Sequence, residues 1–308
     1  MSSSDVTGPG SELFASPPSF FVIGAQKAGT SSIHAALARL DEVSLPSIKE
    51  THFFSKDDCF ERGWSWYRSW FDRDAGGRVC GEVDPAYLYS EAAARRIQTE
   101  FPRARIVVVL REPLARAWSH YRMSVSRGYE TLPFPEALAH EAERLAGDRA
   151  EFSREHHGYL ARSRYVEWLR TYASSFPREQ LLVLRFEELV DPSRSNEVIG
   201  RLLEHIGIER PFALELEHHN PGGATRSKLL NRLLYGDSRI KRLLRPIAPL
   251  RSLRLRVALR LDRWNRRTAG MVEPLDPAGI EPQLLERIRT ETEELQGLLD
   301  WNLAEWLE

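Results

Sequence analysis

The sequence predicts an α/β fold, in which helices cover both faces of a central parallel β-sheet as three layers. Two observations lead to this fold class. Short apolar runs without polar alternation recur along the chain, as in strands that are buried on both faces. Segments with helical patterns separate these runs, which is the order of a parallel sheet with crossover helices. The length of 308 residues and the hydrophobic content of 42% suffice for a sizeable core.

The expected strands are rich in leucine or in β-branched residues. They are Phe20–Ile23, Val79–Val83, Arg105–Leu110 and Leu181–Phe186. Helical composition or apolar spacing of three to four residues marks the segments between and after them. We expect helices over 30–40, 91–100, 113–127, 135–146, 158–175, 194–206 and 281–307.

Composition suggests one folded domain with a tail. Residues 1–18 are low in hydrophobicity and are expected to be a disordered tail. No convincing composition break follows, so we expect a single domain over 19–308. Within it, residues 226–308 are expected to form a mostly helical C-terminal extension.

Charge and cysteine content exclude several classes of protein. The 43 basic and 44 acidic residues nearly cancel, so whole-chain charge gives no reason to expect a nucleic-acid partner. Cys59 and Cys80 provide neither a disulfide framework nor zinc-site spacing, and we expect no metal. The first twenty residues lack a basic and apolar signal pattern, and no apolar run is long enough for a transmembrane span. We therefore expect a cytoplasmic protein.

A basic stretch lies between residues 239 and 267. It holds eleven arginines and lysines, with Asp262 as its only acidic residue, and leucines are interleaved. We favour a helix that packs on the core with a solvated arginine face. Peripheral contact with a membrane surface is the alternative hypothesis.

The most informative segment is the loop Gly24–Ser32, which follows a predicted strand and opens a predicted helix. Unpaired amides at a helix start attract anions. The spacing is close to that of the nucleoside-triphosphatase loop, but Thr30 follows Gly29, and the loop lysine is Lys27. A triphosphate with magnesium is therefore not the obvious ligand. A glycine turn whose hydroxyls merely cap a helix is the alternative.

Five segments together resemble the family of sulfotransferases that use 3′-phosphoadenosine-5′-phosphosulfate (PAPS), especially its bacterial and heparan sulfate branches. In chain order they are FVIGAQKAGTSS, LPSIKETHFF, GEVDPAY, RIVVVLREPLARAWSHY and LVLRFEELVDP. The resemblance covers residues from about 20 to about 230. It implies a P-loop-like fold, no metal requirement, and transfer of a sulfuryl group from PAPS to a hydroxyl or amine.

The resemblance also implies roles for residues of the loop. Lys27 would stabilise negative charge on the leaving phosphate. The 5′-phosphate would be held by the loop residues Gln26, Lys27, Ala28, Gly29, Thr30, Ser31 and Ser32.

Two residues compete for the role of base. Glu50 matches the position of the family's catalytic glutamate, and its aromatic neighbours are of a kind that raises a carboxyl pKa. His52 is the other candidate, because further branches of the family use histidine. If the segment is extended, alternation places both side chains on one face.

Four residues are implied in holding the 3′-phosphate. Arg111 ends a predicted strand, where a charge at the carboxyl edge of the sheet lies in the ligand crevice, and Ser119 lies two helical turns later. A structural ion pair of Arg111 with Glu112 or Glu82 is the alternative. Arg226 and Lys228 match the late basic loop less closely.

Departures from the family pattern concern the acceptor. The heparan sulfate branch has a lysine where this chain has Val83, which argues against a polyanionic acceptor. Asp84 either meets a polar acceptor or caps the following turn. A carbohydrate, a lipid and a secondary metabolite all remain candidate acceptors, and oligomeric state stays open. The competing functions are a P-loop kinase or nucleoside triphosphatase, and a non-catalytic nucleotide-binding module.

Overall fold

A computed structural model describes residue 14 and residues 16–72, 76–208 and 275–307. These residues divide into two compact units. The first consists of the chain up to Glu112 together with residues 164–208 and 293–303. The second consists of residues 113–163, 275–292 and 304–307.

The first unit is built on a five-stranded sheet with the order β2-β3-β1-β4-β5, in which every pairing is parallel. Each side chain of β1 is buried, and in β4 only the first residue is exposed, as expected for central strands covered on both faces. The strands are β1 (Phe20–Gly24), β2 (Val43–Ser44), β3 (Val79–Val83), β4 (Arg105–Leu110) and β5 (Leu181–Arg185).

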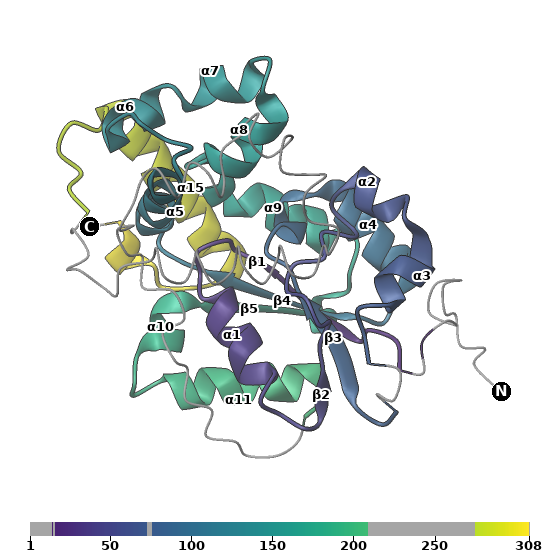
Figure 1. The fold of residues 1–308 in the computed structure, drawn as a ribbon. Coiled ribbons are helices and arrows are strands. Elements are labelled where there is room, and N and C mark those ends of the chain that lie inside the picture. The colour runs from purple at the N-terminus through teal and green to yellow at the C-terminus, as the bar shows by residue number, and fades with distance from the viewer. Residues whose placement is uncertain (1–13, 15, 73–75, 209–274, 308) are drawn as a thin grey trace. The chain divides into compact units, whose positions relative to one another are not determined.

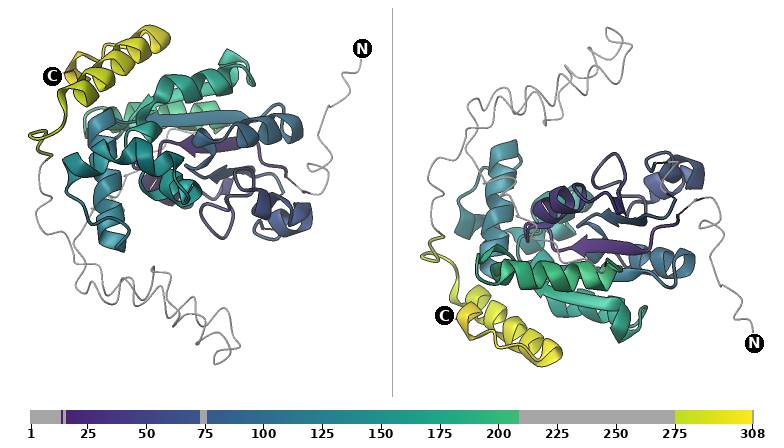
Figure 2. Two further views of the ribbon diagram at one scale, coloured as in Figure 1. Left: turned by 90° about the horizontal axis from the view of Figure 1, so that it is seen from above. Right: turned by 90° about the horizontal axis from the view of Figure 1, so that it is seen from below.

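Helices cover both faces of this sheet (Figure 1). On one side lie α1 (Thr30–Leu37) and α11 (Ser195–Ile206), which stand in front of the sheet when it is viewed from below (Figure 2). On the other side lie α4 (Glu91–Glu100) and α9 (Tyr165–Ala173). This arrangement confirms the predicted three-layer α/β class.

Shorter helices complete the first unit. The chain forms α2 (Asp57–Phe60) and α3 (Gly63–Arg68) between β2 and β3, and α10 (Phe186–Val190) directly after β5. Phe14, which lies in the segment expected to be a disordered tail, packs edge-on against Tyr67 and Phe71. The chain therefore joins the core of the unit before residue 19.

The second unit is helical. It contains α5 (Pro113–Arg127), α6 (Phe134–Ala139), α7 (Glu141–Ala146) and α8 (Ala150–His156). Its core joins α5 and α6 to the segment around Tyr159 and to Ile280. The described C-terminal helix is α15 (Pro282–Leu299).

Four predicted helices differ from those observed by more than one residue, and the first of them, predicted over 30–40, ends at Leu37. The predicted helix 135–146 is two helices that meet at His140. The predicted helix 158–175 starts only at Tyr165, because the buried Glu141 carboxylate accepts hydrogen bonds from the amides of Leu160 and Ala161 and holds them in a turn. The predicted helix 281–307 ends at Leu299, and Asp300 follows with a left-handed φ of 53°.

The sheet brings three strand ends together. Val22 of β1 pairs with Val83 of β3, and Gly24 pairs with Val108 of β4, so these strands end at one edge. After β1 the chain forms β2 and β3 on one side of that strand, and it then forms β4 and β5 on the other side. The order thus reverses between β1 and β4, where ligands bind in open α/β sheets.

The basic stretch 239–267 and the predicted 3′-phosphate residues Arg226 and Lys228 lie outside the described residues, as does most of the predicted extension 226–308. Among the residues that the structure describes, no helix is long and apolar enough to cross a membrane.

Candidate active site

The loop after β1 is fixed to the rest of the first unit by its backbone. The amide of Ala25 donates to the carbonyl of Val109 in β4 at 2.7 Å. The amide of Gln26 donates to the hydroxyl of Tyr89 at 3.2 Å. The amide of Ala28 donates within the loop, to the carbonyl of Ala25. These bonds leave the loop little freedom to move.

The start of α1 offers donors that no described residue uses. Among the described residues, the amides of Gly29, Thr30 and Ser31 have no hydrogen-bond acceptor, and no side chain caps the helix. The Ser32 amide, by contrast, donates to the Gly29 carbonyl. Because unpaired amides at a helix start carry the positive end of the helix dipole, they form a site for an anion.

Gly29 has a conformation that requires glycine. Its φ is +85°, and a Cβ added there would lie 3.1 Å from the ring of Phe186. Lys27, which is half-buried, also has a positive φ of 74°. Positive φ at a residue with a side chain is uncommon and occurs often at functional sites.

Arg111 lies at the end of β4 and contacts the loop. Its Nη1 donates to the carbonyl oxygen of Lys27 at 3.2 Å, and its guanidinium carbon lies 4.7 Å from the centre of the Phe186 ring. The structure thus brings the side chain of Arg111 to the backbone of Lys27, and their shared role in one ligand site stays a prediction. Ser119 is half-buried on α5, in the second unit.

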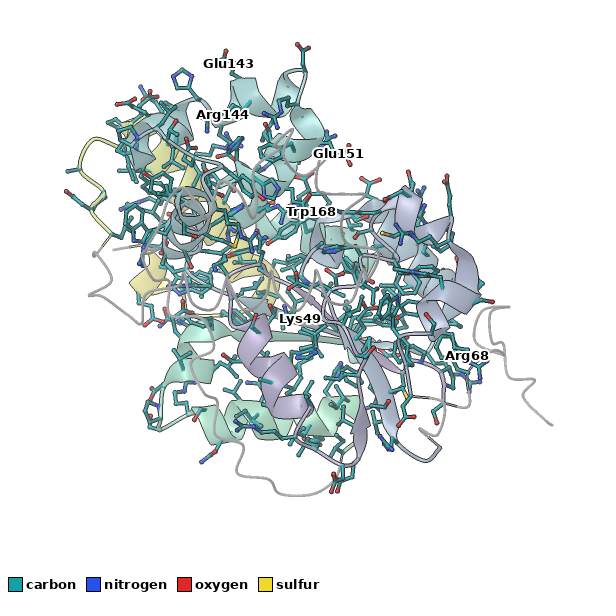
Figure 3. The ribbon with its side chains drawn as sticks, in the orientation of Figure 1. Lys49, Arg68, Glu143, Arg144, Glu151 and Trp168 are labelled. Atoms are coloured by element: carbon teal, nitrogen blue, oxygen red, sulfur yellow. The ribbon has the colours of Figure 1, made fainter. Side chains whose placement is uncertain are left out.

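The two candidate bases lie in a loop and not in an extended strand, so the prediction that alternation puts them on one face is wrong. Glu50 and His52 both have left-handed φ values, of 63° and 55°. The Glu50 carboxylate contacts the ammonium of Lys49. Figure 3 labels Lys49 beside α1, and the charges of both residues act on His34 of that helix. Glu50 therefore lies near the helix that the phosphate loop opens.

A buried carboxylate, Glu82, holds this loop in place through hydrogen bonds. Its Oε1 accepts hydrogen bonds from the amide and the hydroxyl of Thr51, at 3.1 and 2.6 Å. Its Oε2 accepts from the hydroxyls of Tyr67 and Tyr87, at 2.8 and 3.0 Å. Burial and the neighbouring Asp84 charge outweigh these bonds and raise the pKa of Glu82 to about 7.

This role of Glu82 was not predicted from the sequence, where the residue is only a candidate ion-pair partner of Arg111. Tyr67 and Tyr87, which donate to Glu82, are fully buried. The available signal was a carboxylate inside an apolar strand, which must find several donors if it is to be buried.

His52 is held by the carboxylate that follows β3. Asp84 Oδ2 accepts the backbone amide of His52 at 2.8 Å and lies 3.0 Å from its Nδ1. Burial lowers the pKa of His52, but the close Asp84 carboxylate outweighs burial, so the pKa is raised above its usual value. Lys56 acts to lower this pKa and Glu50 acts to raise it.

Comparisons with known proteins agree on one family. Residues 17–219 match the family model described as "Sulfotransferase domain". Human "Heparan sulfate glucosamine 3-O-sulfotransferase 6" is 30% identical over an alignment of 210 residues that covers 66% of this chain and 55% of that protein. Mouse "Bifunctional heparan sulfate N-deacetylase/N-sulfotransferase 2" is 29% identical over an alignment of 197 residues that covers 60% of this chain and 22% of that protein.

A solved structure shows the same fold. The crystal structure of a sulfotransferase from Alicyclobacillus acidocaldarius superimposes with a TM-score of 0.64 at 24% identity, covering 94% of this chain and 99% of that one. The chain spans about half the length of the 3-O-sulfotransferase relatives that it matches.

Proposed function

Because the chain belongs to the sulfotransferase domain family, we propose that it is an enzyme that transfers the sulfuryl group of PAPS to a hydroxyl or amine of an acceptor. The donor leaves as 3′-phosphoadenosine-5′-phosphate (PAP). The acceptor oxygen or nitrogen forms the new bond to sulfur, the bond between sulfur and the 5′-phosphate oxygen breaks, and the acceptor proton passes to a base.

One observation carries this proposal. The free amides of Gly29, Thr30 and Ser31 and the side chain of Arg111 meet at adjacent strand ends, and Arg111 contacts the backbone of the same loop. The donor has two phosphate-bearing ends, and the two parts of the site match them. Amides at a helix start suit the 5′-phosphate, and the planar guanidinium suits the 3′-phosphate.

The remaining residues supply the transfer chemistry. Lys27 lies in the loop, from where its ammonium stabilises charge that grows on the leaving oxygen. Glu50 takes the acceptor proton, and His52 stands beside it. Ser119, Arg226 and Lys228 remain proposed donors to the 3′-phosphate, and Gln26, Ala28 and Ser32 remain proposed neighbours of the 5′-phosphate.

We propose a carbohydrate as the acceptor. The names of the matched relatives specify heparan sulfate. One relative is named as an O-sulfotransferase and another as an N-sulfotransferase. Val83 replaces the family lysine, and buried carboxylates flank it. A neutral sugar therefore suits this region better than a polyanionic chain.

The competing functions differ in what a Glu50→Gln variant does. In an enzyme with Glu50 as base, the variant keeps PAP affinity within about twofold and loses transfer by about a hundredfold or more. Exposed Glu61 provides the matched control, and Glu61→Gln leaves both properties unchanged. Transfer is measured with radiolabelled PAPS over a panel of sugars, and affinity is measured by calorimetry.

Two outcomes would each overturn one part of the proposed function, namely the role of Glu50 or the catalytic activity itself. Unchanged turnover in Glu50→Gln removes Glu50 as the base. Binding of PAP by the wild-type chain without transfer to any acceptor in the panel favours a non-catalytic module. A P-loop kinase would instead require ATP and magnesium.

A further inference from the structure

Asp84 is a fully buried carboxylate whose two oxygens have separate tasks. Oδ1 accepts the amide of Ala86 at 2.9 Å, which is the capping role that the sequence analysis considered. Oδ2 faces the other way, where it accepts the amide of His52 and lies 3.0 Å from the imidazole Nδ1. Capping therefore leaves one oxygen of Asp84 available to His52.

The position of Asp84 is fixed by the sheet. Its own amide donates to the carbonyl of Val22 in β1 at 3.0 Å, so the residue continues the pairing of β3 with β1. These hydrogen bonds fix the position of the Asp84 carboxylate, so it does not shift when His52 changes conformation. His52 must instead adapt to Asp84, and its left-handed φ of 55° is the conformation that brings both its amide and its ring to Oδ2.

The two ring nitrogens of His52 have different surroundings. Nδ1 is buried and makes no well-aligned hydrogen bond within the described part of the chain, but it lies 3.0 Å from Asp84 Oδ2, so this carboxylate is the charged group beside it. In the described part of the chain, no hydrogen bond joins Nε2 to another residue, and the side chain keeps 27% of its surface exposed. A carboxylate next to one ring nitrogen decides which nitrogen carries the proton of a neutral imidazole.

We propose that Asp84 is a positioning residue that holds His52 in the Nδ1–H tautomer, so that Nε2 is a hydrogen-bond acceptor directed at the acceptor substrate beside Glu50. The part of this proposal that concerns the substrate rests on the proposed function. The part that concerns the tautomer does not.

The tautomer has a consequence for the class of acceptor. An unprotonated Nε2 attracts O–H and N–H groups and repels carboxylate and sulfate oxygens. The buried Asp84 carboxylate next to His52 adds to this preference. The site thus selects a hydroxyl-rich or amine-bearing acceptor at this position.

The tautomer is measured directly on the wild-type chain. Long-range ¹H–¹⁵N spectra of uniformly labelled protein distinguish protonated from unprotonated ring nitrogens, and loss of signals in His52→Gln assigns them to His52. We expect a protonated Nδ1 and an unprotonated Nε2 at a pH above the His52 pKa, without any ligand. A protonated Nε2 in the neutral ring overturns the proposal, even if no Asp84 variant folds.

The Asp84→Asn variant tests the role of the carboxylate. We expect a mixed or Nε2–H tautomer, a lower His52 pKa, and a shift of the acidic limb of kcat/KM to lower pH. Lys56 and Glu50 also act on His52 and are unchanged in this variant. We expect KM for the acceptor to rise about tenfold, which corresponds to one lost charged hydrogen bond, with PAP affinity unchanged.

The chain offers a matched control. His140 and Glu143 form a similar pair, with Nδ1 3.0 Å from the carboxylate, but both side chains are exposed, and Figure 3 labels Glu143 on α7. Glu143→Gln leaves the His52 spectrum and the transfer rate unchanged. If Asp84→Asn likewise leaves the His52 signals unchanged, Asp84 does not position the ring. If PAP fails to bind while the predicted tautomer is found, the proposed function is wrong, but the proposal that Asp84 holds His52 in the Nδ1–H tautomer is supported.

Discussion

Three of the four described residues that have both a side chain and a positive φ belong to the candidate site, and the fourth, Asp300, follows α15. Lys27, Glu50 and His52 all have side chains and all have positive φ. Such conformations each cost about 1–3 kcal/mol and persist only where surrounding bonds fix them. Glu82 and Asp84 supply those bonds for the Glu50–His52 loop, and Arg111 supplies one for the loop of Lys27.

Glu82 makes stability depend on pH. Its folded-state pKa of about 7 lies above the usual 4.5, so the folded state binds this proton more tightly than the unfolded chain does. The resulting stabilisation is complete below pH 4.5 and is lost as the pH rises through about 7. Glu82→Gln removes this dependence. The unfolding free energy of the variant relative to that of wild type therefore rises by about 1–3 kcal/mol when the pH is raised from 5 to 8.

Urea unfolding of both proteins at these two pH values measures the gain. Exposed Glu61→Gln is the control and leaves the difference between the two pH values unchanged. An equal effect of Glu82→Gln at both pH values would mean that Glu82 titrates normally in the folded protein.

Gly29 tests the phosphate loop at a single atom. Gly29→Ala places a Cβ 3.1 Å from Phe186 at a φ of +85°, so we expect a loss of about 1–3 kcal/mol in unfolding free energy and at least a tenfold loss of PAP affinity. Gly77 has a similar φ of +80° but no atom within 4 Å of an added Cβ. Gly77→Ala shares the backbone cost and keeps PAP affinity. Equal PAP affinities of the two variants in calorimetry would mean that the loop of Gly29 does not bind PAP.

At the scale of elements, β4 holds the arginine proposed to recognise the 3′-phosphate. We expect wild type to prefer PAP over adenosine 5′-phosphate, and Arg111→Ala to reduce that preference at least tenfold, because a guanidinium–phosphate contact is a charged hydrogen bond. Arg105 starts the same strand and donates to the carbonyl of Glu204. Arg105→Ala keeps the preference. Calorimetry with both nucleotides decides, and an unchanged ratio in Arg111→Ala contradicts the assignment.

Elements with strong local signals were predictable from the sequence. The strands of 105–110 and 79–83 and the helices of 91–100 and 113–127 have the predicted bounds, because their apolar runs or periodicities end at turn residues. The short strand β2 was missed, since two residues carry no pattern of their own. The loop of Glu50 was predicted as extended, because its shape depends on distant Glu82 and Asp84 and not on local propensity.

At the scale of the whole molecule, motif order along the chain predicted the family and the edge of the sheet where the site lies. It did not predict the carboxylates behind the candidate bases. Glu82 and Asp84 lie about thirty residues from Thr51 and His52 in sequence, and only the tertiary fold, in which the loop after β2 contacts the end of β3, brings them together. Long-range contacts of this kind leave no local pattern.

The central claim is that the loop after β1 and Arg111 together hold a nucleotide with phosphates at both its 5′ and 3′ positions. Calorimetric titration of the wild-type chain with PAP, ADP and ATP, each with and without magnesium, tests it most directly. The account predicts tight binding of PAP that is independent of magnesium and at least tenfold weaker binding of ADP and ATP. Preferred, magnesium-dependent binding of ATP would contradict it.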